Sequence, residues 1–260
     1  MWLKVLVGII LVALIAPILV IVPISFSSVS YFEFPPPGYS TKWYANFFSN
    51  SEWVEATFRS LTIALFTAIL AATLGIMASL AVTRLNFWGK QVFMSLMVAP
   101  MIIPLIIIGV ALYHSFAPLG LSNSMLGLVL AHTIIAIPIV FVTVTASLKG
   151  VDKNLELAAL GLGSTPFGAF FKVTLPLIRP AVLSGALFAF IISFDEVVVS
   201  IFLAGSKTKT LPIALWENLR IQVDPTMAAV STILIGITVS LFIIQTLVSA
   251  RKARLRKSVQ

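Results

Sequence analysis

The sequence has no cysteine and very few charged residues. Of its 260 residues, none is cysteine and only 10% are Asp, Glu, Lys or Arg. The first absence excludes disulfides, thiolate metal sites and cysteine nucleophiles. The second excludes an ordinary soluble domain, because such domains carry about a quarter charged residues. Since 59% of the residues are hydrophobic, lipid must be the solvent for most of the surface.

The sequence also lacks motifs that would supply its own energy or catalysis. Its one Gly-Lys pair, Gly89-Lys90, is followed by Gln91 and has no glycine where a phosphate-binding loop requires one. No His/Glu cluster has the spacing of zinc ligands. His114 and His132 are isolated in apolar stretches, where a histidine is more often a hydrogen-bonded packing residue than a ligand. We therefore expect no catalytic residue, metal or cofactor in this chain.

Six apolar stretches are long enough to cross a bilayer as helices, which takes roughly 20 residues each. They predict an all-α membrane protein with one transmembrane domain over 1–260 and spans at 5–26, 60–83, 92–116, 124–148, 177–204 and 226–250. Prolines within spans, such as Pro100 and Pro104, predict kinks that leave this count unchanged. The first stretch is too long for a signal peptide and is followed by no A-x-A-type site, so we expect an uncleaved span.

The basic residues predict the orientation of these spans. With both termini in the cytoplasm, twelve of the 17 Lys and Arg residues are cytoplasmic, as the positive-inside rule requires. They are Lys4, Arg84, Lys90, Lys149, Lys153, Lys172, Arg179, Arg251, Lys252, Arg254, Arg256 and Lys257. The net charge of +8 is thus explained by topology, with anionic lipid binding by the tail as an alternative, and we expect no nucleic-acid partner.

The connection 149–176 is longer than a helix reversal needs. Asp152–Leu160 predicts a short helix with an acid near its start, which favours the helix dipole, and Gly161 and Gly163 predict its end. Thr165 and Pro166 predict the N-cap and first position of a second helix, with Phe167, Phe170, Phe171 and Val173 at helical spacing. Such a pair of helices predicts either a docking surface for a partner or a segment that lies on the membrane.

This loop resembles a known signature. Ala158-Ala159, then Gly163 after three residues, then Val173-x-Leu175-Pro176 is similar to the cytoplasmic loop motif of binding-protein-dependent ABC importer permeases. The family's motif begins with Glu at the position that Leu157 occupies here, while Glu156 lies one residue earlier. Either Glu156 replaces that acid or the acid is dispensable. The resemblance implies a type I importer fold in which Glu156, Ala158, Ala159, Gly163, Phe167, Phe170, Leu175 and Pro176 couple to an ATPase.

The likeness extends to the later part of the chain. The segment 194–200, followed by Leu211-Pro212 and the closing span, resembles the second permease subunit of spermidine/putrescine importers. This resemblance implies a bacterial inner-membrane location and three kinds of partner: a sister permease, two cytosolic ATPase subunits that carry ATP and Mg, and an external solute-binding protein. It also favours a polyamine as the solute. Aminoalkyl phosphonates, amino-acid derivatives or iron remain alternatives.

Asp195 and Glu196 are two adjacent acids within the fifth predicted span. A charge at membrane depth is costly unless it faces protein or water, and adjacent helical residues point about 100° apart. We therefore expect one acid, preferably Asp195, to line a path for a cationic substrate and the other to be paired or neutral. A purely structural acid that bonds to another helix or subunit is the alternative.

Trp216 and Glu217 lie in the external connection before the last span. They are candidates for contact with a solute-binding protein, although Trp43, Trp53, Trp88 and Trp216 all lie outside spans or at their ends, as interfacial aromatics do. Two rival functions are a self-sufficient cation carrier and an intramembrane enzyme. The first would show an internal repeat and the second a cluster of reactive side chains, and neither is visible.

Overall fold

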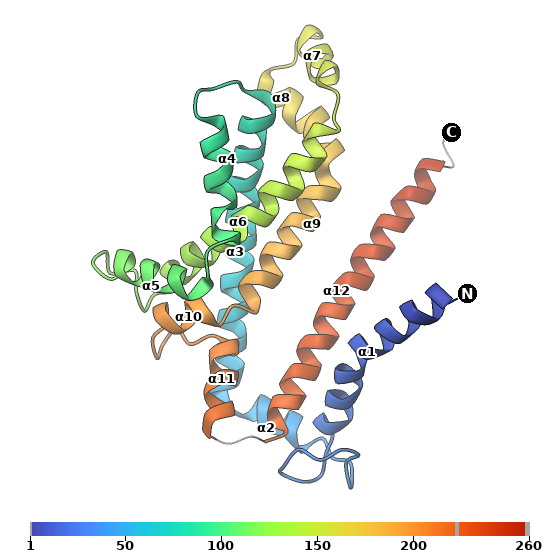
Figure 1. Ribbon diagram of the computed structural model, residues 1–260, viewed down its shortest axis with the longest axis vertical. Coiled ribbons are helices and arrows are strands. Elements are labelled where there is room, and N and C mark those ends of the chain that lie inside the picture. Colours follow the sequence, from blue (N-terminus) through green and yellow to red (C-terminus); the bar gives the residue numbers. More distant parts are fainter. Residues whose placement is uncertain (1, 222–223, 258–260) are drawn as a thin grey trace. The chain divides into compact units, whose positions relative to one another are not determined.

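The computed structural model describes residues 2–221 and 224–257, and within these ranges every regular element is a helix (Figure 1). The all-helical prediction is therefore confirmed. The chain forms two compact units, Met1–Val54 with Glu217–Gln260, and Glu55–Trp216. Helix α3 (Ser51–Arg84) begins in the first unit and runs on through the second, and α11 (Leu211–Ile221) passes between them in sequence.

The first unit contains α1 (Trp2–Ser25), α2 (Lys42–Ser49) and α12 (Thr226–Lys257), and α12 packs on both of the others. The segment between α1 and α2 folds back on itself, and the indole Nε1 of Trp43 donates to the carbonyl of Ser27 at 2.7 Å. Trp43 and Trp53 are 9% and 7% exposed. These two tryptophans therefore pack inside the unit, which differs from the interfacial position expected for them.

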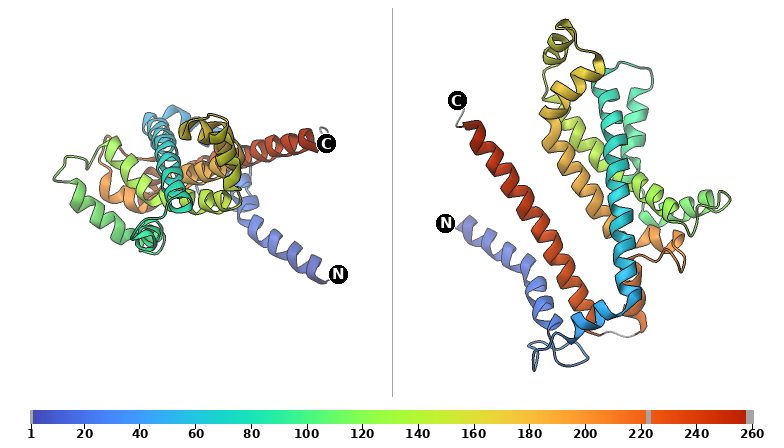
Figure 2. Two further views of the ribbon diagram at one scale, coloured as in Figure 1. Left: turned by 90° about the horizontal axis from the view of Figure 1, so that it is seen from above. Right: turned by 180° about the vertical axis from the view of Figure 1, so that it is seen from behind.

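The second unit is built on three long helices, α3, α6 (Met125–Lys149) and α9 (Leu175–Phe194), which Figure 2 shows from two further sides. Small residues bring them close together. A Cβ on Gly75 of α3 would meet the side chain of Val140 of α6 at 2.7 Å, and one on Gly185 of α9 would meet its Cα at 3.3 Å. Val140 therefore lies between two glycines, the kind of close contact that membrane helices favour.

The third predicted span, 92–116, differs most from its expectation. Helix α4 (Lys90–Val98) continues as a 3-10 turn, Ala99–Met101, and then gives way to α5 (Leu105–Phe116) at an angle of 105°. Pro104 precedes α5 with an extended backbone, because its ring excludes a helical hydrogen bond at this point. The prolines thus break this stretch where a kink was predicted.

Helix length and composition support most of the predicted spans. Among the described residues, α1, α3, α6 and the continuous helical stretch Pro166–Phe194 are long and apolar enough to cross a membrane, and the bent α4–α5 pair would make a fifth. The sixth predicted span falls on α12, of which Thr226–Ser240 qualifies as a shorter apolar helix.

Candidate functional site

The connection after α6 folds into the two short helices that the sequence predicts. Helix α7 (Lys153–Gly161) begins at Asp152, whose carboxylate accepts from the backbone N–H of Asn154 at 2.9 Å. Gly163 takes a left-handed φ of +86°, which ends the helix. Helix α8 (Pro166–Ala169) begins at Thr165, whose hydroxyl accepts from the N–H of Gly168 at 3.1 Å. The predicted caps are confirmed.

A π-helical turn joins α8 to the long helix α9. This turn, η2 (Phe170–Thr174), has no counterpart in the prediction, which ended the segment at Leu175-Pro176. Instead, the helix continues from the turn into α9, where Pro176 is the second residue. The two short helices are therefore connected to the membrane core by continuous helix. Single π turns of this kind are often found at functional positions.

The two short helices expose apolar side chains at their tips. Leu162 is 90% exposed and Phe167 is 74% exposed. Phe167 and Phe170 each pack a ring on Phe171, with centroids 4.6 and 5.0 Å apart. We call the surface formed by Leu162, Phe167 and Phe171 the loop knob. Exposed apolar side chains gathered in this way are typical of contact surfaces.

The other expected coupling residues are spread around the loop knob. Ala158 and Gly163 are exposed, Ala159 is half-buried, and Pro176 is exposed at the start of α9. Leu175 packs against the core formed by α3, α6 and α9. The motif thus combines surface positions with one position that fixes the loop to the transmembrane core.

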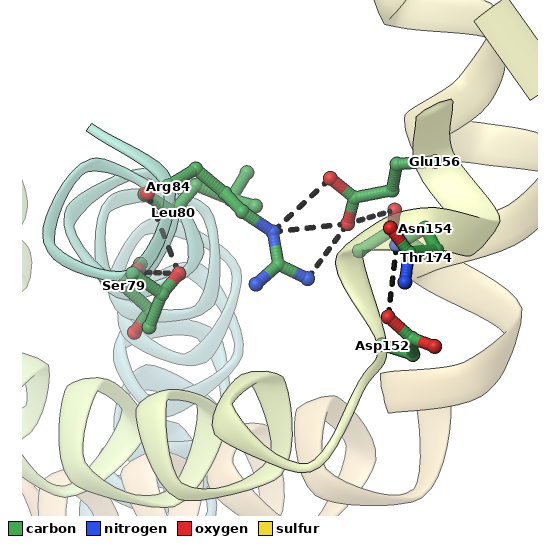
Figure 3. A network of polar contacts seen from close by, with 8 residues as sticks. Ser79, Leu80, Arg84, Asp152, Asn154, Glu156 and Thr174 are labelled. Carbon is green, nitrogen blue, oxygen red and sulfur yellow. Dashed lines mark hydrogen bonds and ion pairs between the residues drawn. The ribbon is translucent and has the colours of Figure 1, made fainter. Parts of the chain in front are cut away.

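Glu156 points toward Arg84 and Thr174 (Figure 3). Arg84, the last residue of α3, donates from Nε to both carboxylate oxygens at 3.0 and 3.1 Å and from Nη2 to Oε1 at 2.7 Å. Thr174, at the end of η2, donates its hydroxyl to Oε1 at 2.8 Å. The carboxylate of Glu156 therefore joins α7 to α3 and to the turn before α9.

The charge state of Glu156 follows from these neighbours. Partial burial works to raise the pKa of its carboxyl, but the hydrogen bonds from Arg84 and Thr174 and the charges of Arg84 and Lys153 favour the ionised form. Together they hold the pKa below its ordinary value of 4.5. Glu156 is therefore ionised at neutral pH, and its ion pair with Arg84 is formed.

Asp195 and Glu196 lie at a break in the fifth predicted span. Helix α9 ends at Phe194, and α10 (Val198–Leu203) starts after three residues. The continuous helix expected over 177–204 is therefore interrupted at the two acids. Glu196 is buried, and its carboxylate accepts from the backbone N–H of Val199 in the first turn of α10 at 2.8 Å. Asp195 is exposed.

His132 of α6 holds the two sides of this break. Its Nδ1 lies 2.8 Å from the hydroxyl of Ser193 in α9, and its Nε2 lies 2.9 Å from the hydroxyl of Ser200 in α10. All three side chains are buried. The prediction that His132 is a hydrogen-bonded packing residue is confirmed, but its partners, which lie on either side of the two acids in the chain, were not foreseen.

Trp216 and Glu217 are neighbours in α11 and do not belong to either of these clusters. Trp216 is 43% exposed. Within the second unit, α11 lies toward the end opposite α7 and α8 (Figure 1). In the described ranges, no group of three His, Cys, Asp or Glu residues lies close enough together to hold a metal ion.

The residues that sequence reasoning missed are Arg84, Thr174, Ser193 and Ser200. Arg84 was counted only as a charge that sets topology, and it lies 72 positions from Glu156. Ser193 and Ser200 have no distinctive pattern around them. Only the packing of α6 on α9 and α10 brings these hydroxyls to His132.

Comparisons with known proteins agree with this architecture. Residues 71–254 match the family described as "Binding-protein-dependent transport system inner membrane component". The chain is 34% identical to the spermidine/putrescine transport system permease protein PotC of Haemophilus influenzae over 90% of this chain and 91% of that protein. It is 35% identical to the putrescine transport system permease protein PotI of Escherichia coli K12 over 86% and 82%. A crystal structure of a bacterial ABC transporter that imports alginate has the same fold, with 17% identity, a TM-score of 0.68 and coverage of 95% of this chain and 93% of that one.

Proposed function

Because this chain belongs to the family of binding-protein-dependent transport system inner membrane components, we propose that it forms the translocation path of an ATP-driven importer and takes its motion from a separate ATPase. The observation that carries this proposal is the loop knob. It presents Leu162, Phe167 and Phe171 to the surroundings on helices fixed to α3 and α9. A surface of this kind suits a groove on a partner subunit.

The path from the loop knob to the acids is a single helix. Helix α9 has 20 residues and is therefore about 30 Å long. It begins directly after η2 and ends directly before Asp195. A displacement of the loop knob by an ATPase would tilt α9 and shift Asp195, which is rigid-body coupling of the kind found in alternating-access proteins.

The proposed assembly has the partners implied by this family. They are a sister permease, two cytosolic ATPase subunits that bind ATP and Mg, and an external solute-binding protein, to which Trp216 and Glu217 are candidate contacts. The loop knob and the α3–α4 connection would face the cytoplasm, with both termini on the same side. The basic residues Arg84, Lys90, Lys149 and Lys153 around these connections support that orientation.

The proposed solute is a polyamine. The named relatives are permeases for spermidine and putrescine, and Asp195 offers an exposed carboxylate at a non-helical position. Unwound backbone at membrane depth is tolerated only where it is buried in protein or lines a water-filled cavity. Asp195 is therefore suited to meet an ammonium group on its way through the path.

Purification of the complex through an affinity tag on this chain tests the proposal. We expect an ATPase, a second permease and putrescine-stimulated ATP hydrolysis after reconstitution in phosphatidylethanolamine/phosphatidylglycerol vesicles that contain the binding protein. Stimulation by an aminoalkyl phosphonate and not by putrescine would replace the solute and leave the importer role intact. Recovery of this chain without any ATPase from freshly solubilised membranes would contradict the importer role.

A further inference from the structure

The carboxylate of Glu156 forms its hydrogen bonds with residues of its own chain. Donors from Arg84 and Thr174 converge on it, and the Arg84 and Glu156 side chains are only 15% and 21% exposed. Arginine–carboxylate pairs with two parallel hydrogen bonds are among the stronger and more directional polar contacts. A pair shielded to this degree is also less weakened by solvent and salt than an exposed one.

The three side chains of this cluster come from three different elements. Glu156 is in α7, Arg84 ends α3, and Thr174 is the last residue of η2 before α9. We infer that Glu156 is a positioning residue, a latch that transmits displacement of the loop knob to α3 as well as to α9. This inference rests on the proposed ATPase contact, and it assigns Glu156 no contact with the ATPase itself.

The neighbouring position separates this role from the one implied by the family motif. The motif places its acid at the position of Leu157, and Leu157 is 61% exposed. Consecutive helical residues point about 100° apart, so an acid at position 157 would point away from Arg84. Glu156 and Leu157 thus offer two alternative places for one carboxylate, and only the first can reach α3.

A double variant, Glu156→Leu with Leu157→Glu, moves the carboxylate by one residue and keeps the composition. In the reconstituted complex, we measure putrescine taken up per ATP hydrolysed. The latch predicts a ratio at least about five-fold below wild type, the lower end of usual coupling strengths, with the ATPase still bound through the loop knob. A wild-type ratio in this double variant would overturn the latch.

Thr174 gives a matched pair of variants. Thr174→Ser keeps the hydroxyl that donates to Glu156, and Thr174→Val removes it at nearly the same volume. We expect the ratio of uptake to hydrolysis to be retained in the first and lowered in the second. Equal ratios in both would count against Thr174 as part of the latch.

A measurement without transport uses the absence of cysteine from this chain, in a complex assembled with cysteine-free versions of the partner subunits. Spin labels at Leu85→Cys, next to the end of α3, and Asn154→Cys in α7 report the distance between these elements in the complete complex. The latch predicts the same narrow distance distribution in the nucleotide-free and ATP–vanadate-trapped states, and a broadened or shifted one after Glu156→Gln. A distribution unchanged by Glu156→Gln in both states would overturn the latch.

These outcomes separate the latch from the proposed function. A wild-type chain that retains no ATPase contradicts the proposed function itself. A wild-type complex that couples hydrolysis to uptake, together with variants of Glu156 that couple equally well, contradicts the latch alone.

Discussion

Asp195 and Glu196 are adjacent in sequence but have different surroundings. Glu196 is buried and caps α10, whereas Asp195 is exposed where α9 has ended. In the proposed translocation path, Asp195 is therefore the better candidate of the two acids for contact with a solute. The break also removes the constraint of a continuous helix, in which adjacent side chains must diverge by about 100°.

The first prediction at this scale concerns Asp195→Asn. The loss of one favourable charge contact of ~1.4 kcal/mol should raise the KM of putrescine uptake about ten-fold, while the amount of assembled complex stays constant. Uptake of radiolabelled putrescine at matched expression measures this change. The comparison variant is Glu196→Ala, which removes the acceptor for the N–H of Val199 at the start of α10 and should lower the yield of folded complex. Unchanged uptake by Asp195→Asn would exclude Asp195 from the path.

The second prediction concerns His132. Its ring bonds to Ser193 and Ser200 on either side of the break. Hydrogen bonds between membrane helices contribute about 0.6 kcal/mol each on average. His132→Phe should therefore lower the free energy of unfolding in detergent by about 1 kcal/mol. Double-mutant cycles with Ser193→Ala and Ser200→Ala measure each coupling. Strictly additive effects would show that these bonds contribute nothing.

At the scale of helices, the contact of Val140 with two glycines gives a third prediction. A methyl group on Gly75 has no room beside Val140, and overpacking of this kind costs about 1–3 kcal/mol. Gly75→Ala should therefore lower the thermal midpoint of the solubilised protein, and a second change, Val140→Ala, should recover part of the loss. Gly8→Ala is the matched control, because nothing lies within 4 Å of the position of its added Cβ. Equal midpoints for Gly75→Ala and Gly8→Ala would contradict this packing.

Elements with local signals could be predicted from the sequence. The helix ends at α7 and α8 depend on residues close to them in sequence. Helix α7 begins after Asp152 and ends before Gly163, and α8 begins after Thr165, as predicted. No glycine or proline in the segment 194–200 predicts the break after Phe194. His132 contacts Ser193 and Ser200 on either side of the break, and these are tertiary contacts, whereas the cap supplied by Glu196 is local. For the same reason, Arg84 could not be connected with Glu156 before the fold was known.

The bend between α4 and α5 is an intermediate case. Pro100 and Pro104 are visible in the sequence and predict a disturbed helix, but their presence alone does not distinguish a kink from a turn of 105°. Gly109 lets α5 approach α10, because a Cβ there would meet the ring of Phe202 at 2.6 Å. The direction of α5 is thus tied to a contact with a helix about ninety positions later, and local sequence cannot specify it.

At the scale of the whole molecule, the second unit has two functional regions, the loop knob and the break at Asp195. Helices α7 and α8 lie at one end of α9 (Figure 1), and Asp195 follows its other end directly. The sequence between them has no phosphate-binding loop. In the proposed importer, the work of ATP hydrolysis would enter through the loop knob, whereas a self-sufficient cation carrier would draw on an ion gradient instead.

The last prediction follows from this division. The purified chain alone, reconstituted in phosphatidylethanolamine/phosphatidylglycerol vesicles, should take up no putrescine against its gradient when a proton or sodium gradient is imposed. The complete complex should take up putrescine against its gradient when ATP is enclosed in the vesicle lumen, which takes the place of the cytoplasm. A related variant replaces Phe167 and Phe171 by serine. It should abolish binding of the ATPase, because the loop knob loses its exposed apolar rings, while the bond from Arg84 to Glu156 still holds α7 to α3. Gradient-driven uptake by the chain alone would instead identify a carrier, in which the loop knob has no role in coupling.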